Sequence, residues 1–331
     1  MNEKNIKIAV AGTGYWGRNL VRTFYNLKCL HCICDVDENA LLDISKNYPG
    51  VKVTTEFDDL LRDKEIKAIV IALPAEMHYE YSRKAILSGK SVFVEKPLSL
   101  SSKDGEQLIK LAEENNCILM VGHLLQYHPA FERLKEIVKS GELGKIQYLY
   151  SNRLNFGKIR MKENILWSFA PHDISMILSL LDEEPESVST NGGYFLSEKV
   201  ADTTLTFLNF SNGTKAHIFV SWLHPYKSQE LVIVGSEKMA VFNDTKSWEE
   251  KLLIYPNKVE WRNGNQILNR KNFEKVSVEE SEPLENECRH FIDCVVNCRK
   301  PVTDGIEGLK VLRVLEASQK SLDSGRTVYL K

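Results

Sequence analysis

No stretch of this 331-residue chain approaches the ~18 consecutive apolar residues of a membrane-spanning helix, so the sequence does not predict a membrane protein. The first residues, MNEKN, lead straight into a short apolar segment and contain no long apolar core of a secretory signal peptide. The 43 basic and 45 acidic residues leave a net charge of −2, which provides no overall field for attracting nucleic acid or an anionic membrane. We therefore expect a cytoplasmic protein with no nucleic-acid or membrane partner, which binds any phosphate through local geometry.

The cysteines do not indicate a disulfide framework, because their number is odd and the chain is long. Cys29 and Cys32 have the spacing of a zinc-binding pair, but no second cysteine or histidine pair completes a four-ligand set, so we expect no metal. Cys32 and Cys34 also lie in an apolar run, which favours buried structural thiols. The seven residues are Cys29, Cys32, Cys34, Cys117, Cys288, Cys294 and Cys298.

The overall composition is that of an ordinary globular protein, with 43% hydrophobic and 27% charged residues. It excludes intrinsic disorder, collagen and coiled coil. At about 150 residues per domain, the length predicts about two domains.

In the first 122 residues, apolar strand patterns alternate with amphipathic helical patterns. Short apolar strands that alternate with helices are typical of a parallel sheet covered on both faces. We therefore predict a doubly wound α/β domain of the Rossmann type over residues 1–122. The expected strands are 6–11, 30–36, 51–55, 68–73, 91–95 and 118–121, and the expected helices are 15–27, 38–48, 58–63, 76–88 and 102–115.

After residue 123 the pattern changes to longer alternating stretches separated by glycine and asparagine turns. These predict an α+β domain over residues 123–331, with one large, mostly antiparallel, open sheet that a helix crosses. The expected strands are 145–155, 186–194, 201–210, 214–222, 230–235, 239–242 and 327–330, and the expected helices are 129–140, 171–181, 284–298 and 305–321.

A glycine-rich loop, Gly12-Thr13-Gly14-Tyr15-Trp16-Gly17, matches the pattern G-x-G-x-x-G between the first strand and the first helix. The first glycine allows a tight turn, the second lets the backbone approach a pyrophosphate, and the third lets the helix pack on the strand. The helix N-terminus offers free N–H groups to the anion. The sequence therefore predicts that Gly12, Gly14, Tyr15, Trp16 and Gly17 bind a dinucleotide, although a glycine turn in another α/β fold stays an alternative.

Asp35 lies 18 residues beyond Gly17 at the end of the second expected strand, close to the spacing of the acid that binds the adenosine ribose. Its carboxylate would accept hydrogen bonds from both ribose hydroxyls and repel a 2′-phosphate. No Arg or Lys follows Asp35 directly, so we predict NAD rather than NADP as the cofactor. The alternative is that Asp35 caps a helix.

Ligands of open α/β sheets bind beyond the carboxyl ends of the strands, and this chain places several polar and proline residues there. A Lys held beside a Pro at a strand end has a fixed direction, and burial would suit it to acid/base chemistry. A surface lysine paired with Glu95 is the alternative for Lys96. The cofactor-binding residues that we predict at this edge are Leu73, Pro74, His78, Glu95, Lys96 and Pro97.

Taken together, the motifs resemble those of the Gfo/Idh/MocA oxidoreductases, a family that includes glucose-fructose oxidoreductase and inositol dehydrogenase. The resemblance covers nearly the whole chain, and its most specific part is the triplet Glu95-Lys96-Pro97. It also rests on the glycine loop with Ala11, on Asp35-Val36-Asp37, on Gly122-His123 with His128-Pro129, and on Pro301-Val302-Thr303-Asp304-Gly305.

The resemblance implies hydride transfer between a nicotinamide and a ring carbon that bears a hydroxyl. It also implies that Lys96 bonds that hydroxyl or relays its proton. The family usually adds an Asp and a His four residues apart on one helix face. Here His172 supplies the histidine, but Ser168 stands where the Asp is expected. We expect Lys96 and His172 to be catalytic, with Ser168 or Asp173 orienting the histidine.

The stretch from Arg153 to Asp173 is basic, contains amides, and is expected to form a loop over the nicotinamide face. Arg and Lys on a loop bind phosphate well, and a tryptophan stacks on rings. A solvated basic loop is the alternative. The expected substrate-binding residues are Lys96, Arg153, Asn155, Arg160, Asn164, Trp167 and His172.

The same stretch resembles the nucleotide-sugar branch of the family, together with Ser221-Trp222-Leu223-His224-Pro225 and the segment 234–240. Its members oxidise the sugar 3-hydroxyl of UDP-N-acetylglucosamine or its uronic acid, and an aminotransferase then uses the 3-keto product to make diamino sugars for lipid A or surface polysaccharide. The resemblance favours the non-oxidised sugar. The alternatives are the uronic acid 3-dehydrogenase, an NADPH-dependent 3-keto nucleotide-sugar reductase and a non-catalytic NAD-bound sensor. The family resemblance also implies a homodimer or homotetramer that buries the open sheet face. Residues 123–331 would then serve both substrate binding and oligomerisation.

Overall fold

The computed structural model describes residues 6–330, which divide into two compact units. The first unit comprises residues 6–127 and 282–312, and the second comprises residues 128–281 and 313–330. The predicted boundary at 122/123 divides the chain only once, whereas in the structure a late segment belongs to the first unit. Within these residues, no helix is long and apolar enough to cross a membrane.

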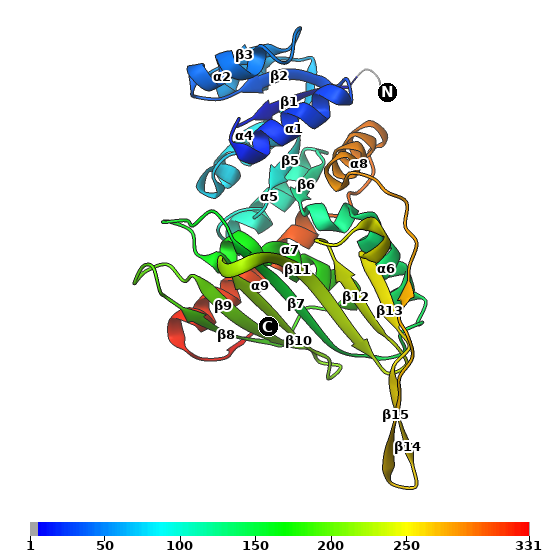
Figure 1. Cartoon of the computed structure of the whole chain (residues 1–331). Coiled ribbons are helices and arrows are strands. Elements are labelled where there is room, and N and C mark those ends of the chain that lie inside the picture. The colour runs from blue at the N-terminus through cyan, green and yellow to red at the C-terminus, as the bar shows by residue number, and fades with distance from the viewer. Residues whose placement is uncertain (1–5, 331) are drawn as a thin grey trace. The chain divides into compact units, whose positions relative to one another are not determined.

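The first unit is built on a six-stranded parallel sheet with the strand order β3-β2-β1-β4-β5-β6 (Figure 1). This is the order of a dinucleotide-binding Rossmann sheet, and it confirms the predicted fold class. The strands are β1 (Lys7–Ala11), β2 (Leu30–Cys34), β3 (Lys52–Thr54), β4 (Ile66–Ile71), β5 (Ser91–Glu95) and β6 (Leu119–Gly122). The helices are α1 (Tyr15–Asn26), α2 (Glu38–Ser45), α3 (Phe57–Arg62), η2 (Ala75–Met77), α4 (His78–Leu87), α5 (Ser102–Glu114), η3 (Leu124–Tyr127), α8 (Pro283–Asn297) and the first part of α9 (Gly305–Ser324).

Alternate residues of the central strands enter two separate hydrophobic clusters, one on each face of this sheet. Ile8 and Val10 lie in the cluster that contains Phe93 of β5 and Phe291 of α8, while Ala9 and Ala11 lie in the other. Side chains alternate between the two faces of a strand, and here both faces are buried, which explains the continuous apolar runs in the sequence.

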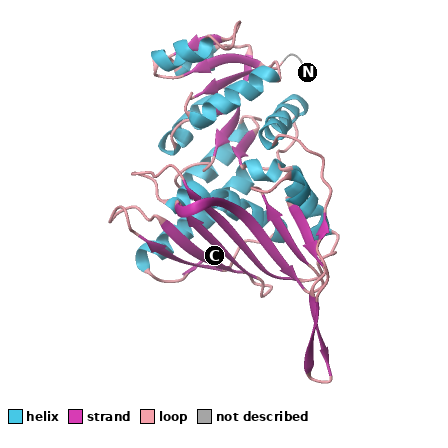
Figure 2. Ribbon diagram, viewed as in Figure 1, coloured by secondary structure: helices cyan, strands magenta, loops and turns pink. Residues whose placement is uncertain are grey.

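The second unit is built on a nine-stranded sheet with the order β16-β13-β12-β11-β7-β10-β9-β8-β17. Figure 2 draws the strands in magenta and the helices in cyan. Only β7 and β10 pair in parallel, so the predicted, mostly antiparallel sheet is confirmed. The strands are β7 (Ile146–Phe156), β8 (Ser187–Gly193), β9 (Thr203–Asn209), β10 (Lys215–Ser221), β11 (Leu223–Gly235), β12 (Met239–Asn243), β13 (Leu252–Tyr255), β16 (Glu274–Lys275) and β17 (Val328–Tyr329). The helices are α6 (Pro129–Lys139), α7 (Ile165–Leu181), η4 (Trp248–Glu250) and the rest of α9.

One face of the nine-stranded sheet is covered by helices, since α7 packs on β7, β9 and β10 while α6 packs on β12 and β13. The other face carries half-exposed aromatic side chains that contact one another. The Tyr150 and His217 rings stack at 5.4 Å, and Phe207 lies 5.7 Å from His217. The sheet is therefore open on this side, as the sequence predicts.

Three features of the second unit differ from the expected elements. The helix expected from Pro171 begins six residues earlier, and β11 extends over 13 residues rather than six. The strands β13 to β16 were not predicted. Two of these, β14 (Lys258–Arg262) and β15 (Asn265–Asn269), form a separate hairpin that projects from the sheet (Figure 1).

The cysteines are all free thiols, and five of them are buried. Burial raises the pKa of Cys29 to about 12 and that of Cys32 to about 11, so neither is a ready thiolate. The expectation of buried structural thiols holds for Cys32 and Cys34, whereas Cys298, which follows the end of α8 in a left-handed conformation, is exposed. Cys117 is partly buried.

Candidate functional site

The glycine loop connects the end of β1 to the start of α1, and its three glycines differ in the space around them. A Cβ at Gly12 would lie 2.4 Å from the carbonyl oxygen of Ala72, and a Cβ at Gly17 would lie 2.0 Å from that of Gly12. No atom lies within 4 Å of the corresponding position at Gly14. The outer glycines are thus required for packing, whereas Gly14 leaves an open approach to the N-terminus of α1.

Asp35 lies directly after β2 and faces this loop, because Thr13 donates to it through both its backbone N–H and its hydroxyl at 2.6 Å. Burial acts to raise the pKa of Asp35, but these hydrogen bonds and one from the Asp37 N–H outweigh it and lower the pKa. An ionised carboxylate beside the open glycine loop fits the adenosine ribose of a dinucleotide. The side chains of Tyr15 and Trp16, predicted to bind the cofactor, are exposed on the first turn of α1.

At the start of α4, His78 links two of the segments predicted to bind the cofactor. The ring is buried, with Nδ1 at 2.6 Å from the Pro97 carbonyl oxygen and Nε2 at 2.8 Å from the Leu73 carbonyl oxygen. Burial lowers the pKa of His78, although both carbonyls act in the opposite direction. The ring therefore holds Leu73, with the following Pro74, against Pro97, and direct cofactor contact by His78 stays a prediction.

Glu95, Lys96 and Pro97 lie at the end of β5, on the same carboxyl edge of the parallel sheet as the glycine loop. Lys96 is partly buried. Burial raises the pKa of Glu95 to about 7, although Lys96 and His123 act to lower it. The Glu95 carboxyl lies over Gly122 of the neighbouring strand, and pairing of Lys96 with Glu95 stays the alternative for this lysine.

Two acidic residues close to this edge were not predicted from the sequence, Glu287 of α8 and Glu307 of α9. Glu307 bonds His123 Nδ1 at 2.6 Å, and Glu287 is buried. The signal for Glu287 was present in the sequence, because it lies between Leu284 and Phe291 on the apolar face of an amphipathic helix.

In the second unit, His172 and Ser168 lie on α7 one helical turn apart. The expected loop over residues 153–173 is wrong in its second half, because the Asn164 side chain caps the helix by accepting from the Trp167 N–H at 3.2 Å. Pro171 lies inside the helix. The proline signal for a helix start was thus outweighed by a better N-cap seven residues earlier.

Asp173, the residue after His172, is held by β7. Arg153 Nε lies 2.7 Å from Asp173 Oδ2, Arg153 donates again to Oδ1 at 3.3 Å, and the Ser151 hydroxyl donates to Oδ1 at 2.5 Å. All three side chains are buried. The structure therefore assigns the Arg153 guanidinium to Asp173, and the predicted binding of a substrate phosphate by Arg153 stays a prediction.

The same network continues to the start of α6. With its amide oriented to satisfy both neighbours, Gln229 accepts from Arg153 at 3.1 Å and donates to Asp244 at 3.0 Å. Asp244 also pairs with His128 at 3.4 Å and with Lys251 at 3.2 Å. A continuous polar network thus connects α7, β7, β11 and α6.

The other predicted substrate residues lie between the end of β7 and α7. Asn155 is the second-last residue of β7, and Arg160 pairs with Glu163 at 2.8 Å in the following loop. Asn164 and the Trp167 ring both donate to Gln319 of α9, at 2.8 and 3.0 Å. Of the two arginines among the predicted substrate residues, Arg160 has the more exposed side chain and Arg153 the more buried one.

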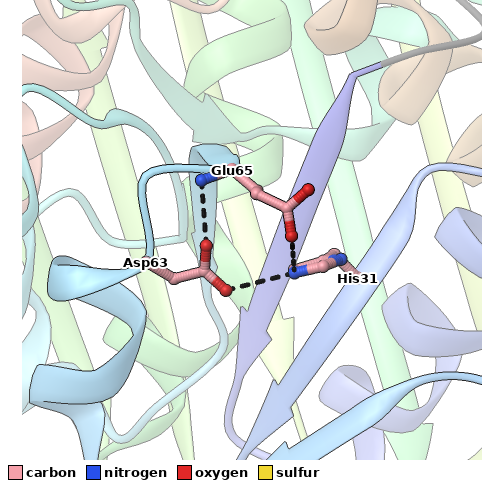
Figure 3. A group of neighbouring side chains, drawn as sticks. All are labelled: His31, Asp63 and Glu65. Atoms are coloured by element: carbon pink, nitrogen blue, oxygen red, sulfur yellow. Dashed lines mark hydrogen bonds and ion pairs between the residues drawn. The ribbon is translucent and has the colours of Figure 1, made fainter.

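One other cluster, His31, Asp63 and Glu65, has the ligand spacing of a metal site (Figure 3). His31 Nε2 lies 3.1 Å from Asp63 and 3.7 Å from Glu65. Lys52 and Lys7 pair with the same carboxylates, so the cluster is an internally neutralised set of ion pairs. The hydrogen bond from the Glu65 N–H, with His31 and Lys52, lowers the pKa of Asp63 to about 2.

Known solved structures share this fold. A UDP-N-acetylglucosamine 3-dehydrogenase from Acidithiobacillus ferrooxidans superimposes with a TM-score of 0.85 at 22% identity, covering 96% of this chain and 98% of the other. GenD2 from gentamicin A biosynthesis, solved in complex with NAD, gives a TM-score of 0.84 at 22% identity, covering 99% and 97%. At these identities the likeness shows the fold alone.

Sequence comparison gives the family. A scyllo-inositol 2-dehydrogenase (NAD(+)) from Bacillus subtilis is 26% identical over 99% of this chain and 97% of its own length. The model of the oxidoreductase family with an NAD-binding Rossmann fold matches residues 6–123, and the model of the GFO/IDH/MocA C-terminal domain matches residues 131–241. Together these matches cover more than half of the chain, which is therefore a member of the Gfo/Idh/MocA oxidoreductase family.

Proposed function

We propose that this protein is an NAD-dependent dehydrogenase that oxidises the sugar 3-hydroxyl of UDP-N-acetylglucosamine to the 3-keto nucleotide sugar. The observation that carries the proposal is Lys96, a partly buried amine at the carboxyl end of β5, on the same sheet edge as the glycine loop. The choice of substrate follows the resemblance of residues 153–173 to the nucleotide-sugar branch, and a curated relative named UDP-N-acetylglucosamine 3-dehydrogenase, 23% identical over 93% of this chain, agrees with it.

The residues of the first unit fit a dinucleotide. The free N–H groups at the start of α1 and the open space at Gly14 suit a pyrophosphate, and the Asp35 carboxylate suits two ribose hydroxyls. Asp35 repels a 2′-phosphate, which favours NAD over NADP. When bound, the nicotinamide supplies the hydride acceptor.

The chain's own residues handle the proton of the reacting hydroxyl. Lys96 and His172 are the groups that we propose to hold and accept it as C3 is oxidised, since amine and imidazole nitrogens serve as general bases in catalysis. Asp173, fixed by Arg153, orients the helix turn that carries His172. Arg160, Asn155, Asn164 and Trp167 are the proposed contacts for the nucleotide sugar.

The test is mass spectrometry of the sugar after incubation with NAD and either UDP-N-acetylglucosamine or its uronic acid. Hydroxylamine should trap the ketone, because alcohol oxidation by NAD is often uphill. A 3-keto product from UDP-N-acetylglucosamine alone supports the proposal, and a product from the uronic acid alone replaces the substrate. A protein that binds NADH but oxidises neither sugar contradicts the proposal. This result would favour first the reduction of a 3-keto nucleotide sugar with NADPH and then a non-catalytic sensor.

The residue assignment is tested by Lys96→Met. Loss of a general acid/base group costs about 10²–10⁴ in turnover, whereas NADH binding, followed by fluorescence, should stay close to that of the native protein. Lys103→Met, which removes an exposed lysine of α5, is the matched control. Normal turnover in the Lys96 variant contradicts the assignment.

We further propose that the open face of the nine-stranded sheet pairs with a second copy of the chain. Its exposed aromatic residues, among them Phe207 at 41% exposure, form an apolar patch of the kind that marks an interface. Light scattering of the eluted protein measures the mass directly. A monomeric mass would contradict this proposal, and Phe207→Glu should shift a dimer or tetramer toward monomer.

A further inference from the structure

The face of the first unit's sheet that α8 covers carries a charged residue where an apolar one is expected. On β5, Phe93 and Glu95 are two residues apart and therefore lie on the same face of the strand. On α8, Glu287 and Phe291 are four residues apart and therefore lie on the same face of the helix. Both pairs consist of one aromatic residue and one carboxylate.

The two pairs are in register. The rings of Phe93 and Phe291 are in edge contact, with centroids 5.5 Å apart. Two residues of a strand span about 6.6 Å, and four residues of a helix span about 6 Å. Asn286, next to Glu287, donates to the Tyr127 carbonyl oxygen beyond the end of β6 at 3.2 Å, so the start of α8 lies near the carboxyl edge of the sheet. α8 therefore runs opposite to β5, and we infer from the match of lengths that Glu287 lies next to Glu95.

The structure leaves room for this carboxyl pair. Gly122 lies beside Glu95 on the neighbouring strand, and a Cβ at this glycine would lie 3.1 Å from Glu95 Oε2. Glu287 is 1% exposed, and its Oε1 has no hydrogen-bond partner among the described residues. A second buried carboxylate beside Glu95 would therefore be neither hydrated nor paired with a cation.

The electrostatic surroundings of Glu287 also favour its protonated form. Burial, followed by the charges of Glu95 and Glu307, raises the pKa of Glu287 well above its usual value. The titratable and charged groups around the pair come from every element that packs there: Glu95 and Lys96 after β5, His123 and Tyr127 after β6, Glu307 of α9, Glu282 and Cys288 beside Glu287, and Cys29 before β2.

We propose that Glu287 retains a proton in the folded chain and, as a neutral acid, donates a hydrogen bond that stabilises the Glu95 carboxylate beside Lys96. Glu287 is then a positioning residue that acts on Lys96 through Glu95. The protonation of Glu287 is independent of the substrate, whereas its effect on Lys96 rests on the proposed function.

The first test measures the free energy of unfolding by denaturant between pH 5 and pH 8 for the native protein, Glu287→Gln and Glu285→Gln. A carboxyl whose pKa is raised by folding contributes stability that is complete below its unfolded pKa and is lost as the pH rises toward the folded pKa. The folding equilibrium constant of Glu287→Gln should therefore rise relative to the native protein by up to about tenfold per pH unit. All other groups near the pair remain in both proteins, so their effects largely cancel.

Glu285 is a partly exposed neighbour on the same helix, paired with Arg289, and Glu285→Gln should run parallel to the native protein. If Glu287→Gln also runs parallel, Glu287 is ionised in the folded chain and the proposal is overturned. This experiment needs no substrate, so its outcome is separate from that of the proposed function.

The second test compares the pH profiles of turnover for Glu287→Gln and Glu287→Met. Both side chains are close to glutamate in size, but only glutamine retains a hydrogen-bond donor. In the methionine variant the Glu95 carboxylate loses its donor, so the acidic limb of the profile, which Glu95 sets, should move to higher pH by at least one unit. The glutamine variant should keep that limb near its native position. Equal profiles for the two variants would show that Glu287 does not act on Lys96.

Discussion

Arg153 and Asp173 form a buried ion pair, with Arg153 Nε 2.7 Å from Asp173 Oδ2 and both side chains almost fully covered. The pair joins the central strand β7 to the middle of α7, next to His172. An acid and a base at this depth are stable only together, because either one alone would be a buried charge without a partner.

Asp173→Asn should therefore lower the free energy of unfolding by about 3 kcal/mol, because it leaves the buried Arg153 guanidinium uncompensated. Denaturant unfolding followed by circular dichroism gives this value. The double replacement Arg153→Met with Asp173→Leu removes both charges and should recover part of the loss. A single variant that is as stable as the native protein would show that the pair is not energetically coupled.

Substitutions at two glycines of the loop should separate an effect on folding from an effect on cofactor binding. Gly12→Ala forces a Cβ to within 2.4 Å of backbone and a left-handed φ of 99°, so we expect it to destabilise the first unit strongly. Gly14→Ala meets no atom within 4 Å and has an ordinary φ of −61°, so the protein should fold normally.

NADH fluorescence titration provides the readout for Gly14→Ala. The added methyl group occupies the approach to the helix N-terminus, and we expect at least tenfold weaker binding with an unchanged melting temperature. Native binding in this variant would show that a pyrophosphate does not approach Gly14.

Asp35→Ser should reduce the preference for NADH over NADPH, because it removes the charge that repels a 2′-phosphate. Titration with each cofactor should show at least a tenfold smaller ratio of the two dissociation constants. Glu38→Gln removes a nearby exposed acidic charge at the start of α2 and should leave the ratio close to native. If both variants change the ratio equally, general electrostatics rather than a ribose contact by Asp35 sets the preference.

The lowered pKa of Asp244 leads us to expect that acid destabilises the second unit. Burial acts to raise its pKa, but His128 and Lys251 outweigh burial and hold the pKa below the usual 3.8. A carboxyl with a lowered folded pKa stabilises the protein above its unfolded pKa, and this contribution is lost as the pH falls through the folded pKa.

Asp244→Asn should accordingly be less stable than the native protein at pH 7. The difference in the free energy of unfolding should shrink as the pH falls below 3.8. Urea unfolding at pH 7, 5 and 3 measures it. A difference that stays constant over this range would mean that the pairing of Asp244 contributes nothing through its charge.

The sequence alone determined that residues 6–122 form a Rossmann fold and in what succession its strands and helices follow one another along the chain, because local periodicity and glycine spacing carry that information. The loop glycines, Asp35 and Lys96 all follow strands that end at one sheet edge, and parallel topology is enough to gather them there. Periodicity also predicted the open sheet of the second unit.

Tertiary structure decided what depends on residues far apart in the chain. The pairing of Arg153 with Asp173 and the return of residues 282–312 to the first unit leave no periodic trace in the sequence. The start of α7 at Ile165 was decided by the cap at Asn164, which outweighed the proline signal. The burial of Glu287 opposite Glu95 arises because α8 packs on β5 with Phe291 against Phe93, and local sequence does not encode which helix will cover which strand.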